Sequence, residues 1–278
     1  MPIQLTLVPE LQLRVSVGQQ ELDLTLTACR IDELRPHERV VPSYLEELKA
    51  AFKRSVYQRN PIIVDSASGV ILDGTHRWAA MKALGYKWIA VCKVDYLNPL
   101  VLLDRWARRY RVKEGYKLSS LLEGLNYEPI RPEDVGDRDL AVIRVNEAYR
   151  IRYAGLTDAY TKAQEIEERL ASLSGSGPTY MPGDQALEER EGVAVLPPVP
   201  LKREILELAR SGILLPPKST RHIIPARPLG VNVPLKLLME DHLDLELLGE
   251  VLRQRRPVLL RAPVSLDREY REIVLYFM

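Results

Sequence analysis

The fold of the first half of the chain is decided by residues 61–94, which read PIIVDSASGVILDGTHRWAAMKALGYKWIAVCKV. Two short apolar runs, 61–64 and 70–72, flank a polar Asp-Ser-Ala-Ser-Gly sequence, so they predict two strands joined by a tight turn. A helix is expected over 78–84, ended by the glycine that follows it, and residues 88–94 return to a strand. Strands and helices that alternate in this way predict a mixed α/β unit.

The regions on either side extend this unit to a domain over residues 1–112. Alternating apolar and polar residues predict a β-hairpin over 3–29. The sequence Ser43-Tyr44-Leu45-Glu46 matches a capping box and predicts a helix that runs to about Ser55. A further helix is expected from Pro99 to about Arg111, with Trp106 on it.

The second half of the chain has weaker patterns, and we expect a second mixed α/β domain over residues 113–278. Residues 115–170 mix helical and extended patterns, and proline-rich sequence over 196–200 precedes the next helix. The patterns predict helices over 158–172, 202–211 and 243–252, strands over 140–145 and 272–277, and a flexible linker over 175–184.

Composition excludes several classes of protein. The 278 residues are 46% hydrophobic and 28% charged, which suffices for one large or two small globular domains. No run of about 18 apolar residues and no signal peptide is recognisable, so we expect a cytoplasmic protein without a membrane partner. A net charge of +1 disfavours nucleic acid as a partner. The high charged fraction with few Cys and Met is typical of thermophile proteins.

The two cysteines do not suggest redox or metal chemistry. Cys29 and Cys92 each lie in an apolar, strand-like run, and neither has a second Cys or a His at the spacing of metal ligands. We expect both thiols to be buried and inert.

The sequence from Asp73 to Arg77 carries the clearest chemical signal, because it lies where a strand ends and a helix begins. Unpaired N–H groups and the positive end of the helix dipole point outward there, which favours phosphate. Gly74 allows close approach, His76 and Arg77 add donors, and Asp73 could hold a divalent metal or orient one of its waters. The alternative is a capped helix with a solvated His-Arg pair.

Two further groups could complete a site. Glu38 follows Pro36 and His37 in an irregular segment, where its carboxylate could orient a hydroxyl, or could simply be a surface charge. In an extended segment Lys218, Thr220 and His222 would project to one side, with Ser219 and Arg221 opposite, and would suit a carboxylate or phosphate. The alternative is a basic surface strand. Trp106, beside several arginines, could be a core residue or a ligand platform.

These motifs together resemble a known family. Their order along the chain is Leu34-Arg35-Pro36-His37-Glu38, Asp73-Gly74-Thr75-His76-Arg77-Trp78, Trp106 and Pro217-Lys218-Ser219-Thr220-Arg221-His222. The pattern is similar to that of the archaeal free-serine kinases of the ParB/sulfiredoxin-like superfamily. The resemblance covers about 30–112 and 200–235. It implies a ParB/sulfiredoxin-like N-terminal domain and a second domain that contributes the substrate-binding segment 216–222.

The resemblance also implies a reaction and a role for each motif. The family phosphorylates free L-serine to O-phosphoserine for cysteine biosynthesis, with ADP or ATP as phosphoryl donor and with Mg²⁺. By that resemblance Glu38 is the catalytic carboxylate, and Asp73 serves the metal and phosphate site. Residues expected around the nucleotide's phosphates are Gly74, Thr75, His76 and Arg77, and those expected around serine are Trp106, Lys218, Thr220 and His222.

One departure and two alternatives remain open. Thr75 stands where the family pattern has a second His, so the choice between ADP and ATP is open. A reactive Cys in this loop would indicate a sulfiredoxin, but Thr75 occupies that position. The alternatives are a ParB-like regulator that binds nucleotide or DNA without transferring phosphate, and a kinase for another small alcohol.

Overall fold

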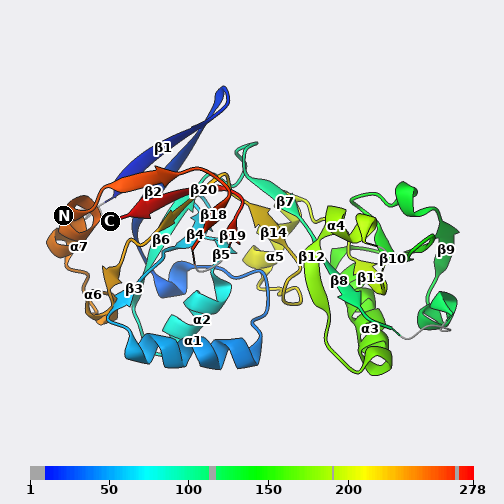
Figure 1. The fold of residues 1–278 in the computed structure, drawn as a ribbon. Coiled ribbons are helices and arrows are strands. Elements are labelled where there is room, and N and C mark those ends of the chain that lie inside the picture. The colour runs from blue at the N-terminus through cyan, green and yellow to red at the C-terminus, as the bar shows by residue number, and fades with distance from the viewer. Residues whose placement is uncertain (1–9, 113–116, 190, 267–268) are drawn as a thin grey trace. The chain divides into compact units, whose positions relative to one another are not determined.

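The computed structural model describes residues 10–112, 117–189, 191–266 and 269–278. The chain divides into two compact units, which are described separately (Figure 1). Unit 1 comprises 1–102, 209–213 and 223–278, and unit 2 comprises 103–208 and 214–222. These units differ from the expected domains 1–112 and 113–278, because the C-terminal residues return to unit 1. The expected fold class, mixed α/β, is confirmed.

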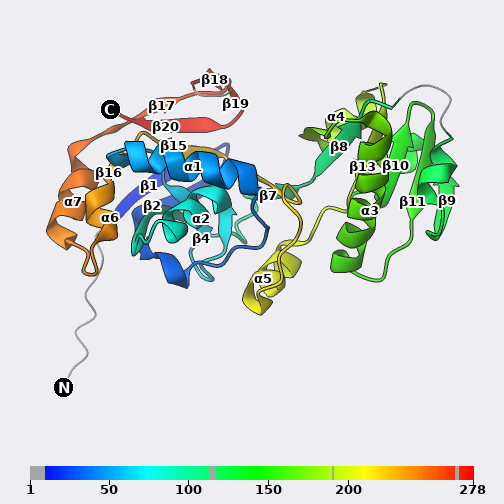
Figure 2. The same cartoon turned by 90° about the horizontal axis from the view of Figure 1, so that it is seen from below.

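Unit 1 is built around a five-stranded sheet in the order β1-β2-β6-β4-β5. All neighbouring pairs are antiparallel except β4 with β6, and the chain connects those two parallel strands through β5 and α2. The helices α1 and α2 lie side by side against the sheet (Figure 2). The elements are β1 (Leu11–Val17), β2 (Gln20–Arg30), α1 (Pro42–Arg54), β4 (Ile62–Asp65), β5 (Ile71–Asp73), α2 (Thr75–Ala83) and β6 (Trp88–Val94).

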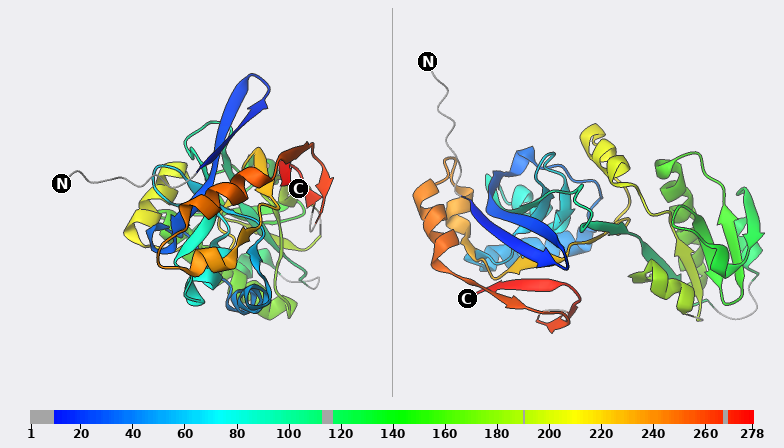
Figure 3. Two further views of the ribbon diagram at one scale, coloured as in Figure 1. Left: turned by 90° about the vertical axis from the view of Figure 1, so that its left-hand side faces the viewer. Right: turned by 90° about the horizontal axis from the view of Figure 1, so that it is seen from above.

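Most predictions for this sheet are confirmed. The hairpin is present as β1 and β2, projecting from the rest of unit 1 (Figure 3), while residues 3–9 of its expected range lie outside the described residues. The tight turn between β4 and β5 and the return to β6 are as expected. Gly85, with φ of 84°, follows the end of α2 and donates its N–H to Lys82 O at 3.1 Å.

The C-terminal part of unit 1 forms a second, three-stranded sheet in the order β15-β20-β17 (Figure 2). β15 pairs with β20 in parallel, and β17 pairs with β20 antiparallel. The predicted helix and final strand are confirmed as α7 and β20. Elements here are β15 (Ala226–Leu229), β16 (Val233–Pro234), α6 (Leu235–Met239), α7 (Leu245–Gln254), β17 (Pro257–Leu260), β18 (Val264–Ser265), β19 (Glu269–Tyr270) and β20 (Ile273–Phe277).

Unit 2 is a six-stranded antiparallel sheet in the order β12-β8-β13-β10-β11-β9. The helix α3 covers one face and α4 the other. The elements are β8 (Trp106–Tyr110), β9 (Tyr127–Ile130), β10 (Leu140–Arg144), β11 (Glu147–Ile151), α3 (Leu156–Ser174), β12 (Thr179–Pro182), α4 (Gly183–Glu188) and β13 (Val193–Leu196). Three elements contain residues of both units: β7 (Leu102–Asp104), α5 (Lys202–Ser211) and β14 (Arg221–Ile223).

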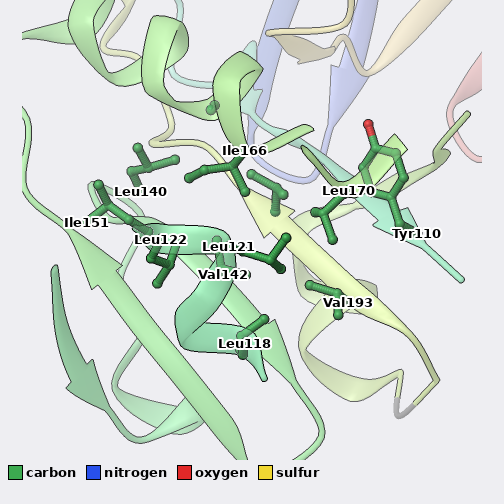
Figure 4. Close-up of a cluster of buried hydrophobic side chains, with 12 residues drawn as sticks. Tyr110, Leu118, Leu121, Leu122, Leu140, Val142, Ile151, Ile166, Leu170 and Val193 are labelled. Atoms are coloured by element: carbon green, nitrogen blue, oxygen red, sulfur yellow. The ribbon is translucent and has the colours of Figure 1, made fainter. Parts of the chain in front are cut away.

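The two faces of this sheet follow from alternation along its strands. Leu140 and Val142 of β10 pack with Ile166 and Leu170 of α3, in the cluster of Figure 4. Ala141 and Ile143 of the same strand belong to a second cluster with Ala186 of α4. The predicted strand 140–145, the helix 158–172 and the helix 202–211 are therefore present as β10, α3 and α5.

Two predictions in this region were wrong. Residues 99–111 do not form a helix: β8 is a strand between β12 and β13, which carries Trp106. Backbone carbonyls accept from the buried arginines of this segment; Arg109, for example, donates to Ala186 O at 2.6 Å. The expected linker 175–184 is regular from Thr179 onward, because β12 pairs with β8 and α4 begins at Gly183.

Candidate functional site

The junction between β5 and α2 has the backbone conformation expected of an anion site. Gly74 precedes the helix with φ of 101°, a left-handed conformation that favours glycine. The Trp78 N–H donates to Gly74 O at 3.0 Å, whereas the N–H groups at the start of α2 have no acceptor within the helix. A Cβ on Gly74 would lie 2.5 Å from Ile62 Cγ2, so the loop packs directly on β4. This arrangement can present backbone donors to a phosphate.

Asp73 is held between two arginines. Arg77 Nη2 donates to Asp73 Oδ2 at 2.9 Å, and Arg227 Nη1 donates to the same oxygen at 2.8 Å. Arg227 in turn forms an ion pair with Glu272. Sequence reasoning missed Arg227 and Glu272. Each is a single charged residue within or beside an apolar run, and such a residue gives no signal of its partner.

Arg77 is part of the scaffold of this loop. Its Nη1 donates to Asn60 O at 3.0 Å and to Pro61 O at 2.7 Å, while its Nη2 bonds Asp73. Both terminal nitrogens of the guanidinium therefore bond groups of the protein. Charge near a phosphate can still be supplied from this position, but a direct phosphate contact through these nitrogens would have to share them with existing bonds.

His76 connects the loop to the start of α1. Its Nε2 accepts the Val41 N–H at 2.8 Å, and its ring lies 5.0 Å from the ring of Tyr44. A nitrogen that accepts a hydrogen bond carries no proton, so in this arrangement the ring proton of His76 is on Nδ1. The predicted Ser43 cap was wrong: Val41 is the residue before the helix, and Pro42 opens it, a position proline favours.

Glu38 lies in a segment tied to β5 and α2 at both ends. Ile71 N–H donates to Arg35 O at 3.0 Å, and the Val41 N–H bonds His76. The Glu38 side chain is 15% exposed, and its Oε1 lies 3.7 Å from His37 Nε2. Burial lowers the pKa of His37, against the opposing effects of Glu38 and of a hydrogen bond with Ile71. A carboxylate beside a neutral imidazole is suited to accept a proton.

The expected substrate residues lie in unit 2, around Trp106. Lys218 Nζ is 5.5 Å and Arg221 Cζ is 5.6 Å from the centroid of the Trp106 ring. Both cations therefore lie near the same ring, and the φ of 62° at Lys218 shows that the segment is not extended throughout, as the predicted alternation of Lys218 and Arg221 requires. Asp104 accepts from Arg221 at 2.9 Å. Cation–π contacts of this kind hold both cations near the Trp106 ring.

Thr220 and His222 are buried beside this group, each 8% exposed. Ser219 between Lys218 and Thr220 has a structural role, because its hydroxyl donates to Pro216 O at 2.8 Å and its carbonyl accepts from Tyr160. The structure thus assembles Glu38 and the Asp73–Arg77 loop in unit 1, and Trp106 and Lys218 in unit 2.

Metal and thiol chemistry find little support in the protein's own residues. Within 10–112, 117–189, 191–266 and 269–278, no three His, Cys, Asp or Glu side chains are grouped as metal ligands. Burial raises the pKa of Cys92 to about 12 and also raises that of Cys29, which is partly exposed rather than buried as expected. Neither thiol is therefore activated. No helix among the described residues has the length and hydropathy to cross a membrane.

The fold and this loop define a mixed α/β protein with a strand–helix junction suited to bind a phosphate, and comparison with known proteins specifies its family. An ATP-dependent L-serine kinase from Staphylothermus marinus is 32% identical in a 234-residue alignment that covers 75% of this chain and 89% of that protein. The ADP-dependent L-serine kinase SerK of Thermococcus kodakarensis is 27% identical in a 222-residue alignment that covers 75% of this chain and 90% of that protein. The chain belongs to this family, that of the ATP- and ADP-dependent L-serine kinases.

A solved structure has the same fold. A free serine kinase in complex with AMP superimposes with a TM-score of 0.64 at 22% identity, over 83% of this chain and 96% of that one. No protein-family model matches the chain.

Proposed function

We propose that this protein transfers the terminal phosphoryl group of ATP or ADP to the hydroxyl of free L-serine, which yields O-phospho-L-serine. The observation that carries the proposal is the 32% identity with an L-serine kinase over nearly nine-tenths of that relative. The proposed product would serve cysteine biosynthesis. The chain's own geometry supports the phosphate half of the reaction through the left-handed Gly74 at the start of α2.

In the proposed mechanism unit 1 binds the nucleotide and carries the catalytic carboxylate. The N–H groups at the start of α2 bind the nucleotide's phosphates, with Gly74, Thr75 and His76 forming the loop. Glu38 accepts the proton of the serine hydroxyl as the serine oxygen attacks the terminal phosphorus, and the nucleotide with one phosphate fewer leaves in line. Most of the acceleration comes from positioning and charge neutralisation.

The serine itself is assigned to unit 2. Lys218 supplies a cation for the carboxylate of the amino acid, and Trp106 holds that cation against its ring face. Thr220 and His222 supply further hydrogen-bonding groups. Their low exposure suits a small ligand bound away from bulk water.

Mg²⁺ fits this site only as an ion that arrives with the nucleotide. Magnesium is commonly bound by one or two carboxylates together with substrate phosphates. Asp73 supplies the carboxylate of the Asp73–Arg77 loop, and two arginines already donate to one of its oxygens. The ion would supply charge neutralisation at the transferred phosphoryl group, and Asp73 would hold it directly or through a water.

The proposal is tested by phosphorus NMR of the purified protein with Mg²⁺ and either ATP or ADP. The acceptors are L-serine, D-serine, L-threonine, L-homoserine and glycerol. We expect a phosphomonoester signal with L-serine, and the donor that produces it settles the question raised by Thr75. If a phosphorylated product forms with another alcohol but not with L-serine, that alcohol becomes the proposed acceptor. No product with either donor would refute the kinase, and a gel shift with duplex DNA would then test the ParB-like alternative.

A further inference from the structure

The side chain of Arg227 joins the C-terminal sheet of unit 1 to the Asp73–Arg77 loop, which we call the phosphate loop. Arg227 lies on β15 and is 8% exposed, and its Nη1 donates to Asp73 Oδ2 at 2.8 Å. Its Nε faces Glu272 Oε1, in an ion pair with the residue that precedes β20. A buried guanidinium is stable only when its charge is compensated, and these two carboxylates compensate the charge of Arg227. Arg227 therefore links Glu272 to Asp73.

Asp73 receives a second cation on the same oxygen, from Arg77 at 2.9 Å. Arg77 approaches from within α2, four residues along the chain, whereas Arg227 comes from 154 residues away. The Asp73 carboxylate cannot turn without giving up two charge-assisted hydrogen bonds. Its orientation at the head of the loop is therefore set jointly by the helix and by β15.

The position of β15 is fixed by contacts that do not involve Asp73. Gly230 N–H donates to Asn60 Oδ1 at 2.9 Å, and Asn232 N–H donates to Arg59 O at 3.1 Å. Immediately beyond, β16 pairs with β3 (Tyr57–Gln58). The same Asn60 supplies the carbonyl that accepts from Arg77. Both arginines are thus anchored to one short segment before β4, and their meeting at Asp73 is a built arrangement.

We propose that Arg227 and Glu272 are positioning residues for the nucleotide site: Arg227 fixes the Asp73 carboxylate, and Glu272 acts through Arg227. This inference rests on the proposed function, in which Asp73 stands at the nucleotide's phosphates and metal. Arg77, Arg227, Asp73 and Glu272 together carry two positive and two negative charges, so the net charge of this cluster is zero. Replacement of Arg227 leaves Asp73 and Glu272 with a single cation near a site that must accept an anion.

The test is ADP affinity, measured by titration calorimetry with Mg²⁺ on the full chain. We expect Arg227→Met to weaken ADP binding about tenfold and to leave the KM for serine within about twofold. If Arg227 acts through Asp73, the same substitution in an Asp73→Asn background should change ADP affinity by less than about twofold. The control is Arg271→Met, because the exposed Arg271 side chain pairs with Glu269, and its backbone N–H, which donates to Glu272 Oε2 at 3.0 Å, is kept by the substitution. The ADP affinity of this variant should match that of the wild type.

Should Arg227→Met fail to fold, Arg227→Lys and Glu272→Gln carry the same comparison, each with an expected loss of about threefold in ADP affinity. Thermal unfolding of each variant identifies any loss of structure. Equal ADP affinity in the wild type and the folded Arg227 variants overturns the inference, as does an undiminished effect in the Asp73→Asn background. If the variants show this pattern of ADP affinities but the wild type forms no phosphoserine, the proposed function alone is refuted.

Discussion

Replacement of Gly74 by alanine tests the conformation on which the phosphate site depends. The residue has φ of 101°, and an added Cβ would lie 2.5 Å from Ile62 Cγ2 and 2.9 Å from Ile62 Cβ. Left-handed backbone costs a non-glycine residue about 1–2 kcal/mol. Overpacking against a buried strand costs about 1–3 kcal/mol more. We therefore expect Gly74→Ala to lower the free energy of unfolding by about 2–5 kcal/mol.

Gly85, just beyond the other end of the same helix, is the matched control. Its φ is 84°, and an added Cβ would meet no atom within 4 Å. Gly85→Ala should therefore show the conformational cost alone, about 1–2 kcal/mol. The difference between the two variants isolates the contacts of the added Cβ with Ile62 and with Arg77 Nη2, which would lie 3.0 Å away, because the gain from restricting the unfolded chain is common to both.

The assay is urea unfolding followed by tryptophan fluorescence in a Trp106→Phe background. The chain has three tryptophans, and this background leaves Trp78 and Trp88, both in unit 1. The signal then reports the unit that contains the loop. Equal destabilisation by Gly74→Ala and Gly85→Ala would refute the close packing of the loop on β4. A loss of ADP affinity in Gly74→Ala but not in Gly85→Ala would connect that packing to phosphate binding.

The remaining predictions concern one catalytic group and two buried ones. Glu38→Ala should lower kcat about 100- to 10,000-fold with little change in the KM for serine, whereas Glu46→Ala, which removes an exposed partner of Lys49, should be neutral in the same steady-state assay. Glu167→Ala should lower the free energy of unfolding by about 3–5 kcal/mol, because Arg108 is buried and loses its ion-pair partner. In the same denaturation experiment Arg131→Ala, which removes an exposed partner of Asp134, should leave the free energy of unfolding nearly unchanged. Burial lowers the pKa of His37 from 6.5, so below that pH the unfolded chain binds a proton that the folded chain does not, and stability should fall as pH decreases until the folded pKa is passed. Urea unfolding at about pH 7.5 and 5.5 should show a smaller pH dependence in His37→Gln, with the difference at most about 1.4 kcal/mol per pH unit; an unchanged slope would exclude His37 as its source.

Local periodicity was sufficient to predict much of unit 1. The β-branched runs of β4 and β5, the helix α2 and the glycine after it are all encoded within a few residues of each other. The helix α5 was predicted with the bounds that the structure has, Lys202–Ser211, because its apolar residues follow a helical period without interruption. The position of the phosphate loop follows from the same local signals.

Strand β8 shows where local reasoning fails. The sequence around Trp106 is rich in Leu, Ala and Arg, which are good helix formers, and this composition led to the prediction of a helix. Its hydrogen-bond partners, β12 and β13, lie about 70 or more residues further along the chain. The buried Arg105 and Arg109 are compensated by backbone carbonyls of distant segments, for example Pro197 O and Glu189 O. No sequence pattern identifies such partners.

Asp73 shows that a sequence motif can locate a functional residue without defining the chemistry of that residue. Taken from the sequence, an aspartate before Gly-Thr-His-Arg is naturally interpreted as a metal ligand, because its carboxylate has no evident partner. In the folded chain two guanidiniums bond one of its oxygens, and the more distant one comes from a strand near the C-terminus. A carboxylate compensated in this way attracts a cation less strongly than an isolated one, but it is held in a fixed orientation. The motif thus locates the residue, while its chemistry depends on Arg227, and the coupling between Asp73→Asn and Arg227→Met in ADP affinity measures that dependence.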